Sequence, residues 1–303
     1  MKVVLVGAVD STRAALEAMV ASGHAPRMLV TLPVELSRRH SDFVDLGPVA
    51  SAAGIDIHRT ERSEAAETLG ALTACAPDLI LVIGWSQICG PAFRAIARLG
   101  TIGFHPSALP RLRGRAVIPW TILAGERQSG ATLFWIDAGV DTGDIAAQTV
   151  FAIDPETETA RGLYDKQISA LAQMLPPLLD RIAQGDVPRQ PQAEDDASWC
   201  ARRRAEDGLI DWRKPAREID RLIRAVGPPY PGAFAAPGGE DRVVITAARP
   251  DPRSGRFIGL AGQIQSIDGE RFSVMCGDGN CLQVTAWSST GWTPKLHAKL
   301  DQG

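Results

Sequence analysis

Two segments of this sequence carry side chains suited to proton transfer. His105 lies in "TIGFHPSALPRLRGRAVIPW" (residues 101–120), and Asp141 lies in the glycine-rich "DAGVDTGD" (residues 137–144). A neutral imidazole accepts a proton from an attacking nucleophile and returns one to a leaving group. A neighbouring carboxylate orients an imidazole and favours its protonated form. A histidine and an aspartate brought together in this way suit acyl-group transfer.

Each of the two segments also has a purely structural interpretation. A lone histidine at the end of a strand is more often a hydrogen-bonded core residue than a catalyst. Acids among glycines, as in residues 137–144, are equally typical of a solvated turn. The residue types alone therefore leave catalyst and structural histidine as alternatives for His105.

The segments around these residues alternate short apolar runs with helical patterns. Strands are predicted at residues 3–6, 28–32, 55–57, 79–83 and 101–104. Helices are predicted at residues 11–22 (with Ser11 as the cap), 47–53, 64–75 and 92–98. This order predicts a doubly wound, Rossmann-like α/β fold with a parallel sheet. Ligands of such sheets bind beyond the carboxyl ends of the strands, where His105 and the loop "GWSQIC" (residues 84–89) lie.

The pattern changes from residue 131 onward. Strands at residues 131–136 and 145–151 flank the acidic turn, and a long amphipathic helix is predicted at 159–184. Short strands and glycine turns from residue 243 onward predict a small β domain. We expect a catalytic domain over residues 1–190, a linker over 191–205 and a C-terminal β domain over 206–303.

Composition and charge exclude several classes of protein. The 303 residues are 45% hydrophobic and 22% charged, with a net charge of −3, which is typical of a soluble globular protein and does not indicate nucleic-acid binding. No apolar run approaches the ~18 residues of a membrane span. The N-terminal "MKVVLVGAVD" is too short in apolar residues for a signal peptide. Five cysteines without a CxxC motif argue against a metal site and for a reducing cytoplasm.

A longer stretch, "GFHPSALPRLRGRAVIPWTILAGERQSGATLFWIDAGVDTGDIAAQ" (residues 103–148), resembles the folate-dependent formyltransferase family. That family includes enzymes acting on methionyl-tRNA, on glycinamide ribonucleotide and on amino sugars. Its pattern is Asn-x-His-x-Ser-Leu-Leu-Pro-x-x-Arg-Gly, then Gly-x-Thr, then Asp-x-Gly. The matching positions here are His105, Ser107, Leu109, Pro110, Arg113, Gly114, Gly130, Thr132, Asp141 and Gly143. Later segments, "RRRAEDGLIDW" and "IRAVGPPYPGAF", resemble the linker and the start of the second domain, which in the family is an OB-like barrel.

The resemblance implies a mechanism and a set of binding residues. The formyl group would pass from 10-formyltetrahydrofolate to a primary amine. His105 would transfer protons, and Asp141 would adjust the proton affinity of His105. The loop after residue 83 would border the cofactor through Trp85, Ser86, Ile88 and Cys89, with Gly139 and Val140 opposite. Ser107, Arg113 and Arg115 would contact the substrate, since guanidinium groups match phosphates and carboxylates. Arg38 and Arg39 are either a solvated face or a phosphate clamp.

The sequence departs from the family at one catalytic position. Gly103 stands where the family has the asparagine that donates a hydrogen bond to the oxyanion. Three explanations compete: a backbone N–H or water takes over, Gln87 supplies the amide, or catalysis is weakened or lost. Loss of one such donor typically costs on the order of 10²–10³ in rate.

Four functions remain open at this point. A formyltransferase acting on a small-molecule amine, a nucleotide-linked aminosugar above all, is the first expectation. Methionyl-tRNA is the alternative acceptor, against which the acidic balance of the chain argues. A hydrolase of 10-formyltetrahydrofolate and a folate-binding protein with weak or no turnover are the others. A homodimer is compatible with each of them.

Overall fold

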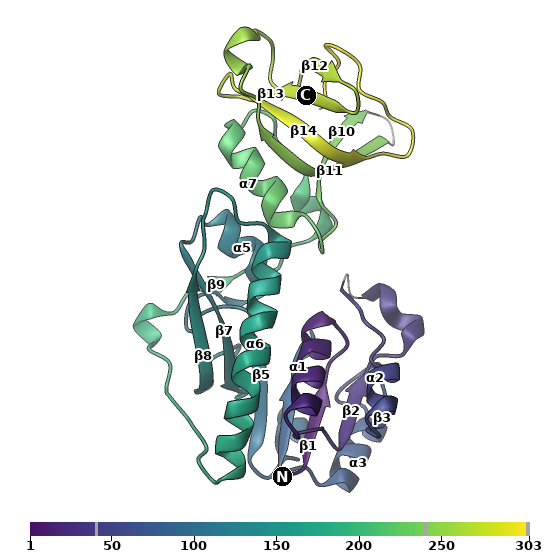
Figure 1. Ribbon diagram of the computed structural model, residues 1–303, viewed down its shortest axis with the longest axis vertical. Coiled ribbons are helices and arrows are strands. Elements are labelled where there is room, and N and C mark those ends of the chain that lie inside the picture. The colour runs from purple at the N-terminus through teal and green to yellow at the C-terminus, as the bar shows by residue number, and fades with distance from the viewer. Residues whose placement is uncertain (40–41, 239–240, 301–303) are drawn as a thin grey trace. The chain divides into compact units, whose positions relative to one another are not determined.

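The computed structural model describes residues 1–39, 42–238 and 241–300 (Figure 1). The chain divides into two compact units. Unit 1 comprises residues 1–117, 128–152 and 164–201, and unit 2 comprises residues 118–127, 153–163 and 202–303. Two segments that precede residue 164 therefore belong to unit 2, which a linear division into domains does not anticipate. The expected domain boundaries at residues 190 and 205 stay a prediction.

Unit 1 is built on a seven-stranded sheet in the order β3-β2-β1-β4-β5-β7-β8. Its parallel strands are β1 (Val3–Val6), β2 (Met28–Thr31), β3 (Asp56–Arg59), β4 (Leu79–Val82) and β5 (Gly100–His105). Two strands, β7 (Gln128–Trp135) and β8 (Ile145–Ala152), extend it antiparallel. The predicted Rossmann-like, mostly parallel sheet is confirmed.

Helices cover both faces of this sheet. They are α1 (Asp10–Ala21), α2 (Gly47–Ala52), α3 (Ala66–Cys75), α4 (Pro91–Arg94) and α6 (Ala160–Ala183), with the 3₁₀ turn η1 at Val34–Arg39. Alternate residues of β1 point to opposite faces, since Val3 and Leu5 pack with α1 and α6 while Val4 and Val6 pack with α3 and α4. Figure 1 shows α6 running along the sheet beside β5.

Two details of these helices differ from the sequence-based expectation. The N-cap of α1 is Val9, and Ser11 lies buried inside the first turn. The hydroxyl of Thr12 takes the capping role, accepting the Val9 N–H at 3.2 Å and donating to the Ile83 carbonyl at 2.6 Å. The helix expected at 92–98 is shorter and ends at Arg94.

Unit 2 contains a five-stranded antiparallel sheet in the order β10-β11-β14-β13-β12. Its elements are most of α5 (Val117–Leu123), then η3 (Ala205–Gly208), α7 (Ala216–Val226), β10 (Ala233–Gly238), β11 (Asp241–Pro250), η4 (Ser254–Arg256), β12 (Ile264–Asp268), β13 (Arg271–Met275) and β14 (Cys281–Ser288). Helix α7 buries Ile219, Ile223 and Val226. This half-barrel confirms the predicted C-terminal β domain. None of the helices within the described residues is both long enough and apolar enough to cross a bilayer.

Candidate active site

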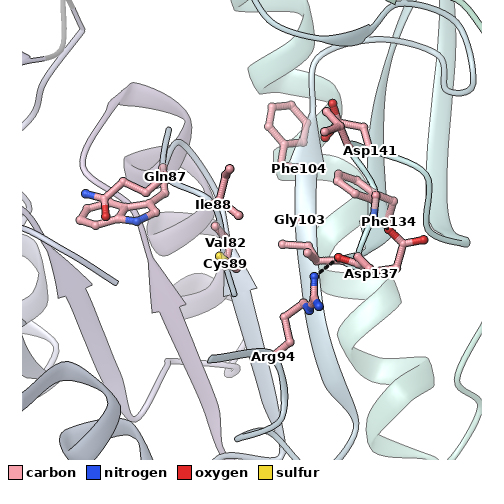
Figure 2. A pocket seen from close by; sticks show the side chains of 15 residues that line it. Val82, Gln87, Ile88, Cys89, Arg94, Gly103, Phe104, Phe134, Asp137 and Asp141 are labelled. Carbon is pink, nitrogen blue, oxygen red and sulfur yellow. Dashed lines mark hydrogen bonds between the residues drawn. The ribbon is translucent and has the colours of Figure 1, made fainter. Parts of the chain in front are cut away.

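A cavity of about 240 Å³ opens at the carboxyl ends of β4 and β5. The loops after β4 and β7 and the short helix α4 complete its wall, as Figure 2 shows. The lining residues are Val82, Trp85, Gln87, Ile88, Cys89, Arg94, Gly103, Phe104, Phe134, Ile136, Asp137, Ala138, Gly139, Val140 and Asp141. The two segments singled out for their chemistry therefore meet at the edge of the sheet where ligands of α/β folds bind.

His105 and Asp141 lie side by side at this edge. His105 is the last residue of β5, and its Nδ1 is 3.5 Å from Asp141 Oδ2. Its Nε2 donates to the Leu112 carbonyl at 2.8 Å. Asp141 Oδ2 also accepts the Gly114 N–H at 2.8 Å. Asp141 lines the cavity, whereas the His105 side chain, 6% exposed, lies behind it.

The contacts of the imidazole constrain its protonation. A carbonyl oxygen only accepts, so Nε2 carries a proton. Nδ1 faces a carboxylate oxygen, which is also an acceptor. Only the imidazolium has a donor for both partners, and the neutral ring turns a lone pair toward Asp141. The pair is thus arranged to hold a proton between two groups, one of which lines the cavity.

Gly103 is covered by an aromatic ring. A Cβ placed on Gly103 would lie 3.0 Å from Phe134 Cε1 and 3.1 Å from Ile136 Cγ1. These distances are tighter than ordinary carbon–carbon contacts of about 3.5–4.0 Å. The space beside Gly103 is consequently apolar, and an asparagine side chain does not fit there without movement of Phe134.

Gln87 does not supply the missing amide in this structure. Its Nε2 donates to the Glu61 carbonyl at 2.6 Å, and its Oε1 accepts the Ser63 N–H at 3.1 Å. Figure 2 shows its side chain on the opposite side of Ile88 from Gly103. In this structure the Gln87 amide fastens the loop after β4 to residues 61–63, which argues against its service as the oxyanion donor, and that role stays a prediction.

The other residues expected near a cofactor fall into two groups. Trp85, Ile88, Cys89, Gly139 and Val140 line the cavity, and Ile88 is 85% exposed. Burial raises the pKa of the Cys89 thiol to about 12, with a smaller contribution from the Glu64 carboxylate, so Cys89 is a neutral wall residue. Ser86 is not among the lining residues.

The residues expected to contact the substrate each have a hydrogen-bond partner within the protein. The Ser107 hydroxyl is buried and donates to the Arg111 carbonyl at 2.7 Å. Arg113 is fully buried and donates to the side chains of Gln192 and Glu194. Arg115 is exposed and donates to the Ser86 carbonyl at 2.9 Å. The burial of Ser107 and Arg113 argues against their contact with a substrate. The side chains of Arg38 and Arg39 lie outside the described part of the chain.

The cavity also contains a cation that the sequence patterns did not indicate. Arg94, in α4, donates through Nη1 to the Asp137 carbonyl (Figure 2). The Asp137 carboxylate in turn accepts the Gly139 N–H at 2.9 Å and the Thr142 hydroxyl at 2.8 Å. Arg94 lies well beyond the end of β4 in the sequence and belongs to none of the motifs identified there. Its place at the cavity therefore follows from the fold.

Comparison with known proteins identifies the family of this chain. Residues 12–179 match the model of the "Formyl transferase" family, and residues 203–291 match that of the "Formyl transferase, C-terminal domain". The chain belongs to the formyl transferase family. A methionyl-tRNA formyltransferase of Symbiobacterium thermophilum is 31% identical over 285 residues, covering 93% of this chain and 86% of that protein.

Solved structures share the fold of this formyl transferase family member at lower identity. HypX from Aquifex aeolicus, in complex with tetrahydrofolic acid, is 18% identical with a TM-score of 0.69 over 95% of this chain. The chain spans only 44% of the length of that HypX chain. An N-formyltransferase from Helicobacter canadensis, in complex with folinic acid and dTDP-3-aminofucose, is 21% identical with a TM-score of 0.63, covering 94% of this chain and 98% of that one.

The family assignment confirms the expected enzyme class and donor. The chain is a folate-dependent formyltransferase. The one-carbon donor of this family is 10-formyltetrahydrofolate.

Proposed function

We propose that this formyltransferase carries the formyl group of 10-formyltetrahydrofolate to the primary amine of a small molecule, namely a nucleotide-linked aminosugar. The observation that supports formyl transfer most directly is the His105–Asp141 pair beside the cavity at the ends of β4 and β5. A carboxylate at the wall with an imidazole behind it can take up and return a proton without solvent.

The lining residues fit a flat, partly polar ring such as that of a folate. Trp85, one of the lining residues, has a buried Nε1 without a hydrogen-bond partner among the described residues. Phe104, Ile136 and Val82 supply apolar wall, and the backbone of residues 137–141 supplies polar groups. Small-molecule sites typically combine an apolar wall with a few placed polar groups.

The reaction requires one bond to form and one to break. The amine nitrogen bonds to the formyl carbon, the bond from that carbon to the folate nitrogen breaks, and a proton moves from the amine to the departing nitrogen. Asp141 lies at the wall and accepts the proton of the amine. His105, behind it, stabilises the carboxylate and keeps it oriented through Nδ1.

The negative charge that develops on the formyl oxygen has no asparagine to meet it. With the Gln87 amide bound to residues 61–63, a backbone N–H or a water molecule is left to stabilise that charge. Removal of a dedicated donor lowers the rate, so this arrangement favours a slower enzyme than its asparagine-containing relatives.

Three observations bear on the identity of the acceptor, and they favour two different candidates. The net charge of −3 and the full-length similarity to the sugar enzyme from Helicobacter canadensis support an aminosugar. The 31% identity with a methionyl-tRNA formyltransferase supports charged initiator tRNA as the second candidate. A cytoplasmic location and a homodimer stay predictions.

The test supplies 10-formyltetrahydrofolate and a panel of acceptors: nucleotide-linked 3- and 4-aminosugars, charged initiator tRNA and water alone. Ultraviolet absorbance follows the release of tetrahydrofolate. We expect release only with an aminosugar. Release with tRNA alone assigns the second candidate. Release with water alone indicates a hydrolase, and stoichiometric folate binding without release indicates a binding protein.

A further inference from the structure

One segment of unit 1, residues 192–200, contacts both the loop after His105 and the loop that carries Asp141. Its strand β9 (Trp199–Cys200) pairs in parallel with β6 (Arg113–Gly114). The 3₁₀ turn η2 (Glu194–Asp196) lies just before it. We call residues 192–200 the strap. None of the motifs in the sequence marks this segment, whose composition is that of a linker.

Gln192 holds the backbone of the Asp141 loop. Its Nε2 donates to the carbonyls of Asp141 at 2.8 Å and Gly143 at 2.7 Å. Asp141 has a φ of 55°, in the left-handed region that residues other than glycine rarely adopt. Such a conformation persists only where surrounding contacts hold it. The amide of Gln192 is placed to provide that restraint.

Ser198 holds the backbone of Leu112, the residue that accepts a hydrogen bond from the His105 ring. Its Oγ accepts the Leu112 N–H at 2.9 Å, and its carbonyl accepts the Arg113 N–H at 2.8 Å. Leu112 also has a left-handed backbone, with a φ of 59°. The carbonyl of Leu112 is the acceptor for His105 Nε2. The strap therefore fixes the hydrogen-bond partner on one side of the histidine and the carboxylate on the other.

Arg113 joins the strap to the core. Its Nε and Nη2 donate to Gln192 Oε1 at 3.1 and 2.8 Å, and its guanidinium pairs with Glu194 at 2.7 Å. The hydrogen bond from Arg113 lowers the pKa of Glu194, which favours the ionised form that pairs with the guanidinium. Because Gln192 Oε1 is taken by Arg113, its amide nitrogen is aimed at the Asp141 loop.

We infer that Gln192 and Ser198 are positioning residues, which set the distance and orientation between His105 and Asp141 without touching a substrate. The inference rests on the proposed function for its effect on rate, and on the hydrogen bonds above for its geometry. Errors of about 1 Å in the placement of reacting groups can cost on the order of 10²-fold in rate. The strap would then affect kcat much more than KM.

Gln192→Glu separates this role from simple packing. Glutamate still accepts from Arg113 but cannot donate to the carbonyls of Asp141 and Gly143. We expect Gln192→Glu and Gln192→Ala to slow turnover about 10- to 100-fold, with the KM for 10-formyltetrahydrofolate within about threefold of wild type. Gln190→Ala, an exposed residue two positions earlier, is the matched control and should keep the wild-type rate.

Two results would overturn the inference. Wild-type turnover in Gln192→Glu would show that Gln192 serves only as an acceptor for Arg113. Wild-type turnover in both Gln192→Ala and Ser198→Ala would show that the strap does not position the pair. Thermal unfolding of each variant identifies any that fail to fold, and Ser198→Ala, which leaves Arg113 and its partners in place, remains informative if Gln192→Ala is lost.

A spectroscopic measurement tests the geometry even if the wild-type protein transfers no formyl group. The ¹⁵N chemical shifts of the His105 ring report which nitrogen carries a proton. We expect Nε2 protonated in the wild type, a changed Nδ1 shift in Gln192→Glu and an unchanged spectrum in Gln190→Ala. An unchanged Nδ1 shift in Gln192→Glu contradicts the positioning role. A wild type without turnover but with the expected spectra refutes the proposed function alone.

Discussion

The ring of Phe134 lies against the backbone of Gly103. The two residues face each other across the antiparallel pair of β5 and β7. A Cβ on Gly103 would come within 3.0 Å of Phe134 Cε1 and 3.1 Å of its Cζ. A side chain at position 103 would therefore meet this ring at its first carbon, so the ring has to shift for any larger residue to fit.

Gly103→Asn alone should not improve the enzyme. The new side chain has to displace the buried Phe134 ring, and overpacking of this kind typically costs about 1–3 kcal/mol. We expect the variant to unfold at lower denaturant concentration and to gain no rate. Urea unfolding and steady-state kinetics measure both effects.

The double variant Gly103→Asn/Phe134→Leu provides the control. Leucine lacks the Cε1 and Cζ atoms that make the closest approach. We expect it to tolerate the asparagine better than the single variant and to turn over about tenfold faster or more, as an added oxyanion donor does. A double variant that folds but transfers no faster than wild type would show that the missing amide does not limit this site.

Gln87→Ala should leave turnover within about threefold of wild type. Its amide binds Glu61 and Ser63, so its loss loosens the loop after β4 and removes no contact with reacting atoms. The expected change is a modest loss of stability, since a typical hydrogen bond contributes about 1 kcal/mol. Turnover slowed on the order of 10²- to 10³-fold, at unchanged folate affinity, would restore Gln87 as the oxyanion donor.

Arg94→Met should weaken folate binding. The guanidinium fastens α4 to the Asp137 carbonyl, and its loss frees one wall of the cavity. Hydrogen bonds from charged groups contribute about 1.5–3 kcal/mol, so we expect the Kd for tetrahydrofolate to rise about tenfold in fluorescence titration. Arg98→Met, which removes an exposed ion pair with Asp78, is the matched control and should bind normally. Unchanged affinity in Arg94→Met argues against a role in the cavity.

Acid should destabilise unit 2 through Asp251. The hydrogen bond from Arg253, aided by that from Ser273, lowers the pKa of this buried carboxyl from 3.8 to about 2. Asp251 in the unfolded chain therefore binds a proton more tightly than Asp251 in the folded chain does. The resulting stabilisation, about 2 kcal/mol, is present above pH ~4 and is lost as the pH falls toward 2.

Asp251→Asn tests this pH dependence. Urea unfolding should show a difference between wild type and variant at pH 5 that shrinks by pH 2.5. Asp196→Asn, at an exposed site, should follow the wild type at both values. A difference that stays constant with pH would mean that Asp251 does not titrate with folding.

The apolar strands of unit 1 were predictable because each is a continuous hydrophobic run. Val3–Val6 is buried along its whole length, as expected for a strand covered on both faces. The cap of α1 was not predictable in the same way. Ser11 has the right residue type, but Thr12 reaches both Val9 and Ile83, and the second contact depends on the sheet.

The pair of His105 and Asp141 was predictable from the motif, whereas its supports were not. Gln192 and Ser198 lie in a segment whose composition is that of a linker, and their partners are 51 and 86 positions away in the chain. Arg113 has the residue type of a phosphate ligand, yet full burial gives it Gln192 and Glu194 as partners. Long-range contacts of this kind leave no periodic or compositional signal.

Amine-dependent formyl transfer by Asp141→Asn, compared with wild type, tests the central claim most directly. Asparagine keeps an oxygen for the Gly114 N–H but cannot take a proton from the amine. Tetrahydrofolate release from 10-formyltetrahydrofolate should depend on the amine in the wild type and fall on the order of 10²-fold or more in the variant, with folate binding retained. Wild-type release by Asp141→Asn would contradict the account, because the carboxylate at the cavity wall would then play no part in the transfer.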